Sequence, residues 1–264
     1  MELDYVPLLQ IQRELQGLPR NYERFRQYLR TMIGSNGDTL GLPPLGIVNP
    51  MGREHVTALL EALLALDADG IAARALAEAS SNLANEPGPF KVGLVVADDL
   101  KGGWTNRYDY EFKLRFGFGP VASGGARPKW LKDFWLTCVL WSSEPATEQR
   151  VRAAVLTTVY RAAYLQRNGP ARTLRDMLAQ EGHVMKSAGC TGPTLDADDV
   201  AYTREVLTPF LDSEDKRTAI ECLFGDAAGR TLGFTPRGLS PWAGLALALH
   251  DARPHQNLLA FGSA

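Results

Sequence analysis

The spacing of apolar residues changes in the middle of the chain from a helical period to an alternation. In residues 108–116 every second side chain is apolar or aromatic, and charged side chains stand between them. Successive side chains of a strand point to opposite faces of its sheet, so this pattern predicts a strand with one buried and one solvated face. One-sided strands of this kind are typical of antiparallel sheets.

Two more strands are predicted close to this one in the sequence. Residues 90–97 place large apolar side chains on one face and small or neutral ones, such as Gly93 and Ala97, on the other. Residues 134–141 are apolar on both faces apart from Thr137, which predicts a central strand that is covered on both sides. The polar segment 98–107 then joins the strand at residues 90–97 to the strand at residues 108–116 as a hairpin.

The rest of the chain has apolar residues at helical spacing. Before the sheet, helices are predicted over residues 7–34, with a break at Pro19, and over 53–66 and 71–83. After it, helices are predicted over 147–167, 170–186, 196–211, 213–224 and from 240 onward. The predicted fold class is α+β, with a small mid-chain antiparallel sheet of three or four strands flanked by helices before and after it in sequence.

One stretch of the chain reads as a boundary. Residues 34–52 are rich in glycine, proline and asparagine, which interrupt regular structure. We therefore expect an N-terminal helical arm over residues 1–40 and a single α+β domain over residues 41–264.

Composition and charge exclude several classes of protein. The 264 residues carry a formal net charge of −2, which argues against nucleic acid as the main partner. Three scattered cysteines favour a reducing compartment over a disulfide scaffold. No apolar run approaches the ~18 residues that span a bilayer, and no signal peptide is expected. A cytoplasmic protein without membrane contact is predicted.

The polar connection at residues 98–107 is the most plausible place for chemistry, because sites gather on loops held by a rigid sheet. Its carboxylates, Asp98 and Asp99, are the predicted catalytic groups, one of them acting as a general base. Four further residues are predicted to bind the ligand through charge, stacking or an amide: Lys101, Trp104, Asn106 and Arg107.

Other chemical signals are weak. The chain has no metal-binding motif of known spacing, so no metal ligands are predicted, and no motif indicates a particular cofactor. Cys190 follows His183 by seven residues, but no surrounding pattern marks the cysteine as a nucleophile. Glycines at 117–119 and 124–125 lack the spacing of a phosphate-binding loop.

Two functions of different class therefore remain open. The first is an enzyme or binder of a small polar or anionic ligand that uses residues 98–107. The second is a non-catalytic module that binds another protein or, as a homo-oligomer, a second copy of itself. It would use the basic aromatic helix at residues 20–30 or the open sheet face. The residues leave open whether the protein is catalytic.

Overall fold

The computed structural model describes residues 1–33, 40–100, 106–117 and 135–253. Its contacts divide the chain into two compact units, Met1–Pro170 and Ala171–Ala264. The predicted boundary near residue 40 stays a prediction, although the N-terminal segment opens with a strand before its helices.

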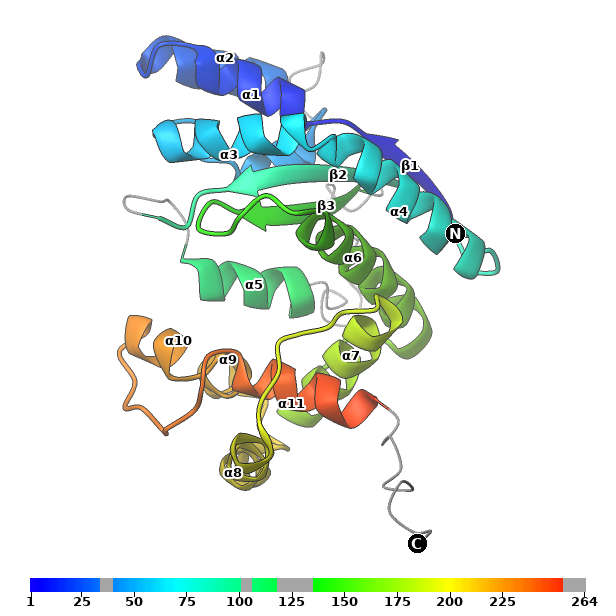
Figure 1. Cartoon of the computed structure of the whole chain (residues 1–264), viewed down its shortest axis with the longest axis vertical. Coiled ribbons are helices and arrows are strands. Elements are labelled where there is room, and N and C mark those ends of the chain that lie inside the picture. The colour runs from blue at the N-terminus through cyan, green and yellow to red at the C-terminus, as the bar shows by residue number, and fades with distance from the viewer. Residues whose placement is uncertain (34–39, 101–105, 118–134, 254–264) are drawn as a thin grey trace, which may run out of the picture. The chain divides into compact units, whose positions relative to one another are not determined.

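The first unit contains a three-stranded sheet in which every strand is parallel to its neighbour (Figure 1). The strands are β1 (Glu2–Val6), β2 (Pro89–Ala97) and β3 (Trp135–Trp141), in that order, with β2 in the centre. Val6 pairs with Gly93, and Gly93 pairs with Thr137. The predicted antiparallel sheet is therefore wrong.

Helices cover both faces of this sheet, as is typical of parallel sheets. On one face Tyr5 of β1 donates a hydrogen bond to Asp69 of α4 (Ala68–Asn82). On the other face Gly93 lies so close to Leu8 that a Cβ on Gly93 would be 2.6 Å from the Leu8 Cδ1. The last six residues of the central strand β2 are all buried, as expected of a strand that is covered on both faces.

The segment predicted as the second strand is a helix, α5 (Arg107–Phe116). Its aromatic residues Phe112 and Phe116 are four apart and buried, with ring centroids separated by 5.1 Å. The Asn106 side chain caps the helix by accepting a hydrogen bond from the backbone N–H of Asp109. Consequently residues 98–107 do not form a hairpin, and β2 and β3 are joined by a long crossover that includes a helix, as is usual between parallel strands.

The other helical predictions for this unit are confirmed with small shifts of their ends. The helices are α1 (Leu9–Gly17), α2 (Tyr22–Met32), α3 (Glu54–Ala65), α4 and α6 (Glu148–Asn168), with a 3₁₀ turn η1 (Pro43–Ile47). Helices α4 and α6 pack against each other, and α6 also contacts β3. Helices α1 and α2 and η1 share an apolar cluster with Val95 of β2.

Within its described residues the second unit contains helices and loops and no strand. It consists of α7 (Leu174–Ser187), α8 (Ala197–Leu207), η3 (Thr208–Phe210), α9 (Lys216–Phe224), α10 (Asp226–Thr231) and α11 (Ala243–Ala252). Helix α11 is its core, since Ala243–Leu249 are all buried and α7, α8 and α9 pack on it. Close approach requires glycine: a Cβ on Gly182 would lie 2.5 Å from the Ala248 carbonyl oxygen.

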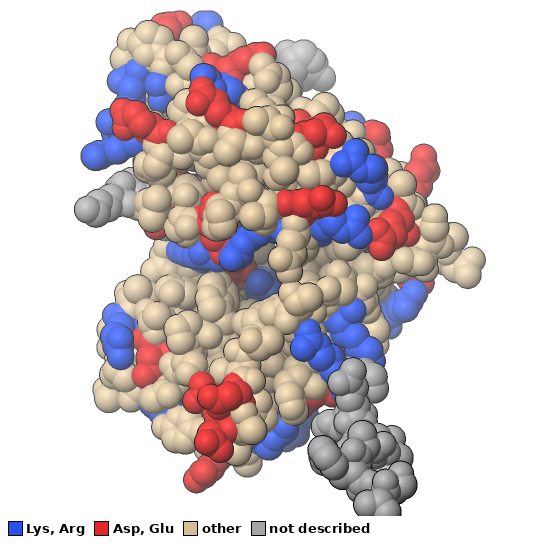
Figure 2. Space-filling model, in the orientation of Figure 1, with Lys and Arg blue, Asp and Glu red and all other residues tan. Residues whose placement is uncertain are grey.

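The surface carries both signs of charge. On the face drawn in Figure 2, acidic and basic side chains are interspersed, in keeping with the small net charge. Within the described ranges, no helix combines the length and the hydropathy that a membrane crossing requires.

Candidate functional site

Polar side chains converge where β2 and β3 end. Asp98 and Asp99 follow β2, and Ser142 and Ser143 follow β3. The carboxyl ends of parallel strands meet at one edge of the sheet, which is where α/β proteins bind their ligands. The backbone N–H of Ser142 donates to the carbonyl of Ala97 at 2.9 Å, so the two strands hold these residues side by side.

Asp98 is the centre of this cluster. Its side chain is 2% exposed. One carboxylate oxygen accepts from the backbone N–H of Leu100 at 3.2 Å and lies 2.8 Å from Nε2 of His55. The other accepts from the Asn49 side-chain amide at 3.1 Å. A carboxylate buried with this many donors is fixed in place.

His55 lies in the first turn of α3 and reaches Asp98 across 43 residues of sequence. Its side chain is 28% exposed, so the ring is reached by solvent while one edge faces the buried carboxylate. Among the described residues, Nδ1 has no hydrogen-bond partner. The ring is therefore held through Nε2 and has no hydrogen-bond partner at Nδ1 among the described residues.

The loop before α3 is positioned by a second set of buried polar groups. The Gln16 amide donates to the Asn49 carbonyl at 2.8 Å, and Arg24 donates to the Gln16 side-chain oxygen at 3.1 Å. Asn49 also accepts from the Met51 backbone N–H at 2.9 Å. These contacts orient the Asn49 amide toward Asp98, and they turn Arg24 of the basic helix inward rather than toward solvent.

Asp99 and Arg107 form the adjoining part of the cluster. Asp99 accepts from the Ser143 backbone N–H at 2.9 Å and from its hydroxyl at 2.6 Å. Arg107 pairs with Asp99 at 3.2 Å and also with Glu144, and its guanidinium lies 5.3 Å from the Trp141 ring centroid. Burial opposes the charge of Arg107, but Glu144, Glu111 and Asp99 outweigh it and raise its pKa.

Ser142 joins the two aspartates. Its hydroxyl lies 3.1 Å from a carboxylate oxygen of Asp98 and 3.1 Å from one of Asp99, and it can donate its single proton to either. It also accepts from the Asp99 backbone N–H at 3.2 Å. Asp98, Asp99 and Arg107 are thus part of one hydrogen-bonded network at the sheet edge.

Of the residues predicted for the site, the structure brings together Asp98, Asp99 and Arg107, while Asn106 caps α5. Lys101 and Trp104 lie outside the described residues. Sequence reasoning missed His55, Asn49 and Ser142. Two sequence features could have indicated them. The apolar residues 45–48 are followed by a segment that contains Asn49 and His55, and two serines come directly after β3.

The described residues include two buried cysteines, Cys138 and Cys222, and one partly buried cysteine, Cys190. They contain no group of three or more histidine, cysteine, aspartate or glutamate side chains arranged to hold a metal. Burial raises the pKa of both Cys138 and Cys222 to about 12, so each remains a thiol at neutral pH.

Comparison with protein-family models, with curated proteins and with solved structures found no match to this chain.

Proposed function

We propose that the first unit binds a small polar ligand at the carboxyl edge of its sheet and that His55 transfers a proton to or from that ligand. The observation that carries the proposal is the 2.8 Å contact between Nε2 of His55 and Asp98, in a ring whose Nδ1 has no partner within the described residues. Histidine is the commonest general acid and base in enzymes.

The proposal gives Asp98 a positioning role. A buried carboxylate that accepts from one ring nitrogen fixes the orientation and tautomer of the imidazole, and it stabilises the imidazolium that forms during proton transfer. Asp98 is already surrounded by donors, whereas His55 is partly exposed. Proton transfer is therefore assigned to His55, while the sequence assigned it to an aspartate.

Charge at the sheet edge favours a neutral polar ligand over a strongly anionic one. Arg107 forms ion pairs with Asp99 and Glu144, and its guanidinium lies 3.8 Å from a carboxylate oxygen of Glu111. Three carboxylates leave little positive potential for an added anion. Sugars, polyols and nucleosides have the hydroxyl groups that suit a histidine base and a carboxylate-lined edge.

The test is a thermal-shift screen of the full chain against such compounds, because a ligand that prefers the native state raises the melting temperature. Conversion of each hit is then followed by proton NMR. His55→Gln should leave the fold intact and reduce conversion by ~10²–10⁴-fold, the usual contribution of a general base.

The chain offers a matched control. His250 lies 3.0 Å from Asp251 in an exposed pair on the second unit, so His250→Gln removes a similar pair from a different place. Equal loss of conversion in both variants, or none in His55→Gln, would contradict the proposal.

The interaction module is kept as a second candidate because of one observation. Tyr22 of α2 is 71% exposed, and Arg26 lies 5.8 Å from its ring centroid. Exposed aromatic and arginine side chains are frequent in interfaces. Sedimentation of the full chain and of Tyr22→Ala tests it: self-association that the variant abolishes favours this candidate.

A further inference from the structure

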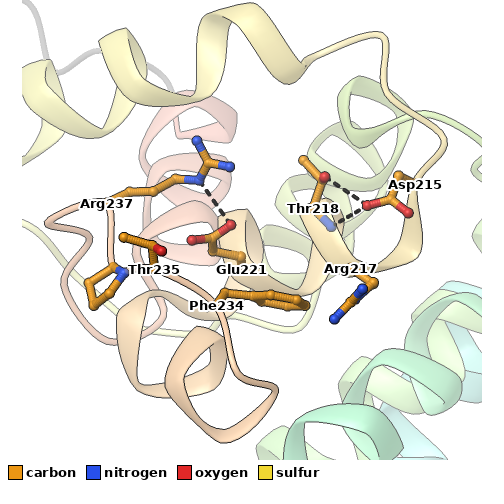
Figure 3. Close-up of a pocket in the computed structure, with 8 residues that line it drawn as sticks. Asp215, Arg217, Thr218, Glu221, Phe234, Thr235 and Arg237 are labelled. Atoms are coloured by element: carbon orange, nitrogen blue, oxygen red, sulfur yellow. Dashed lines mark hydrogen bonds and ion pairs between the residues drawn. The ribbon is translucent and has the colours of Figure 1, made fainter.

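The second unit has a pocket of about 460 Å³, a size typical of small-molecule sites. One wall is a face of α9, and the other is the segment that follows α10 (Figure 3). Its polar and aromatic lining includes Arg217, Thr218, Glu221, Phe234, Thr235 and Arg237.

Both walls are held in place by hydrogen bonds. The Asp215 carboxylate caps α9 by accepting from the Thr218 backbone N–H at 2.8 Å. On the opposite side, the buried carboxylate of Asp226 accepts from the backbone N–H groups of Arg237 and Leu239 at 3.0 and 3.1 Å. A pocket that is already formed loses less entropy when a ligand binds.

Two stacked guanidinium groups supply donors to the pocket. Arg217 lies 4.5 Å from the ring centroid of Phe234, and Arg237 lies 4.3 Å from that of Phe210. Within the described part of the chain, Arg217 has no ion pair, and Arg237 pairs through Nε with Glu221 at 2.9 Å. The terminal nitrogens of both side chains are left to bind an oxyanion.

Glu221 requires a hydrogen-bond donor from a ligand, whereas the two arginines require an acceptor. It is 3% exposed, and one of its carboxylate oxygens, Oε1, is buried without a hydrogen-bond partner among the described residues. In Figure 3 this second oxygen points toward the side where Thr235 lies, away from Arg237. Buried polar atoms are nearly always hydrogen-bonded, so an unpartnered one in a pocket wall indicates a missing donor.

We propose that this pocket binds a small organic acid that carries a hydroxyl or ammonium donor next to its carboxylate. The carboxylate binds the terminal nitrogens of Arg237, Arg217 adds positive charge to the same pocket, and the donor satisfies the free oxygen of Glu221. This site is independent of His55, which lies in the other unit.

Three probes of similar size separate the two requirements. Propionate has the carboxylate alone, lactate adds a hydroxyl, and alanine adds an ammonium group. Each is titrated into the ¹⁵N-labelled full chain to about 20 mM, the range in which millimolar sites saturate. We expect saturable shifts of the Thr218 and Thr235 amides, with lactate or alanine binding about tenfold more tightly than propionate.

Variants assign the binding to these side chains. Arg237→Gln and Arg217→Gln should each weaken binding about tenfold, and Glu221→Gln should remove the preference over propionate. Arg175→Gln is the control, since Arg175 pairs with Asp212 at 3.0 Å on the surface of the same unit. If Arg237→Gln fails to fold, Arg217→Gln, which breaks no ion pair, still decides the result.

The proposal is overturned if none of the three probes gives saturable shifts, if propionate binds as tightly as the other two, or if Arg175→Gln weakens binding as much as the pocket variants do.

Discussion

His55 and Asp98 constrain each other at the level of single atoms. An ionised carboxylate can only accept hydrogen bonds, so Nε2 of His55 carries the proton that lies between the two groups. Nδ1 then keeps its lone pair, and it has no hydrogen-bond partner among the described residues. A base with one fixed tautomer needs no rearrangement before it accepts a proton.

This geometry predicts the tautomer of His55 directly. In the neutral form the proton should be on Nε2, whereas His250, whose Nδ1 lies 3.0 Å from Asp251, should favour Nδ1–H. Long-range ¹H–¹⁵N spectra distinguish the two forms, and Asp98→Asn should weaken the preference of His55 alone. An Nδ1–H form of His55 in the wild-type chain would rule out the assigned role.

At the scale of elements, the position of α1 on the sheet depends on one buried side chain. The Gln12 amide donates to the Val96 carbonyl at 2.8 Å, and its oxygen accepts from the Val96 backbone N–H at 2.9 Å. Strand β1 ends opposite Gly93, so Gln12 supplies the partners that a longer β1 would have supplied. This contact fixes the last part of β2, immediately before Asp98.

Gln12→Leu should therefore destabilise the protein by about 2–4 kcal/mol, because it leaves a buried N–H and a buried C=O unpaired. Urea unfolding measures the change. Gln10→Leu is the control, since Gln10 is exposed and its amide donates to Glu14 in the next turn of the same helix. A cost below about 1 kcal/mol for Gln12→Leu would show that the backbone of β2 finds other partners.

The alternation in residues 108–116 shows how one pattern fits two elements. Positions that alternate include positions four apart, so Phe112 and Phe116 share a helix face as well as a strand face. The decisive local signal was Asn106 followed three residues later by Asp109, a pair typical of a helix N-terminus. Strand β1 was missed because five residues give too short a pattern.

At the scale of the whole molecule, stability depends on pH through Asp69. Burial raises the pKa of this carboxyl in the folded chain, a smaller effect of Asp67 adds to the rise, and the hydrogen bond from Tyr5 opposes it. Ionising Asp69 is therefore harder in the folded chain than in the unfolded one. Its contribution to stability is full below its ordinary pKa of 3.8 and is lost as the pH rises through the folded value.

Asp69→Asn should remove this loss. The free energy of unfolding of the variant, relative to wild type, should be higher at pH 7 than at pH 4, as measured by urea titration at each pH. Asp4→Asn, an exposed change on β1, should show no such difference. A relative stability that falls between pH 4 and pH 7 would contradict the direction of the shift.

The sequence by itself determined the helices outside the sheet, apart from α10, because helical periods and caps are local. It also placed Asp98, Asp99 and Arg107 in one polar segment. Only the tertiary structure decided the direction of the strands and the pairing of His55 with Asp98. The physical reason is range: strand pairing and the His55 contact join residues separated by dozens of positions, and no local pattern encodes such contacts.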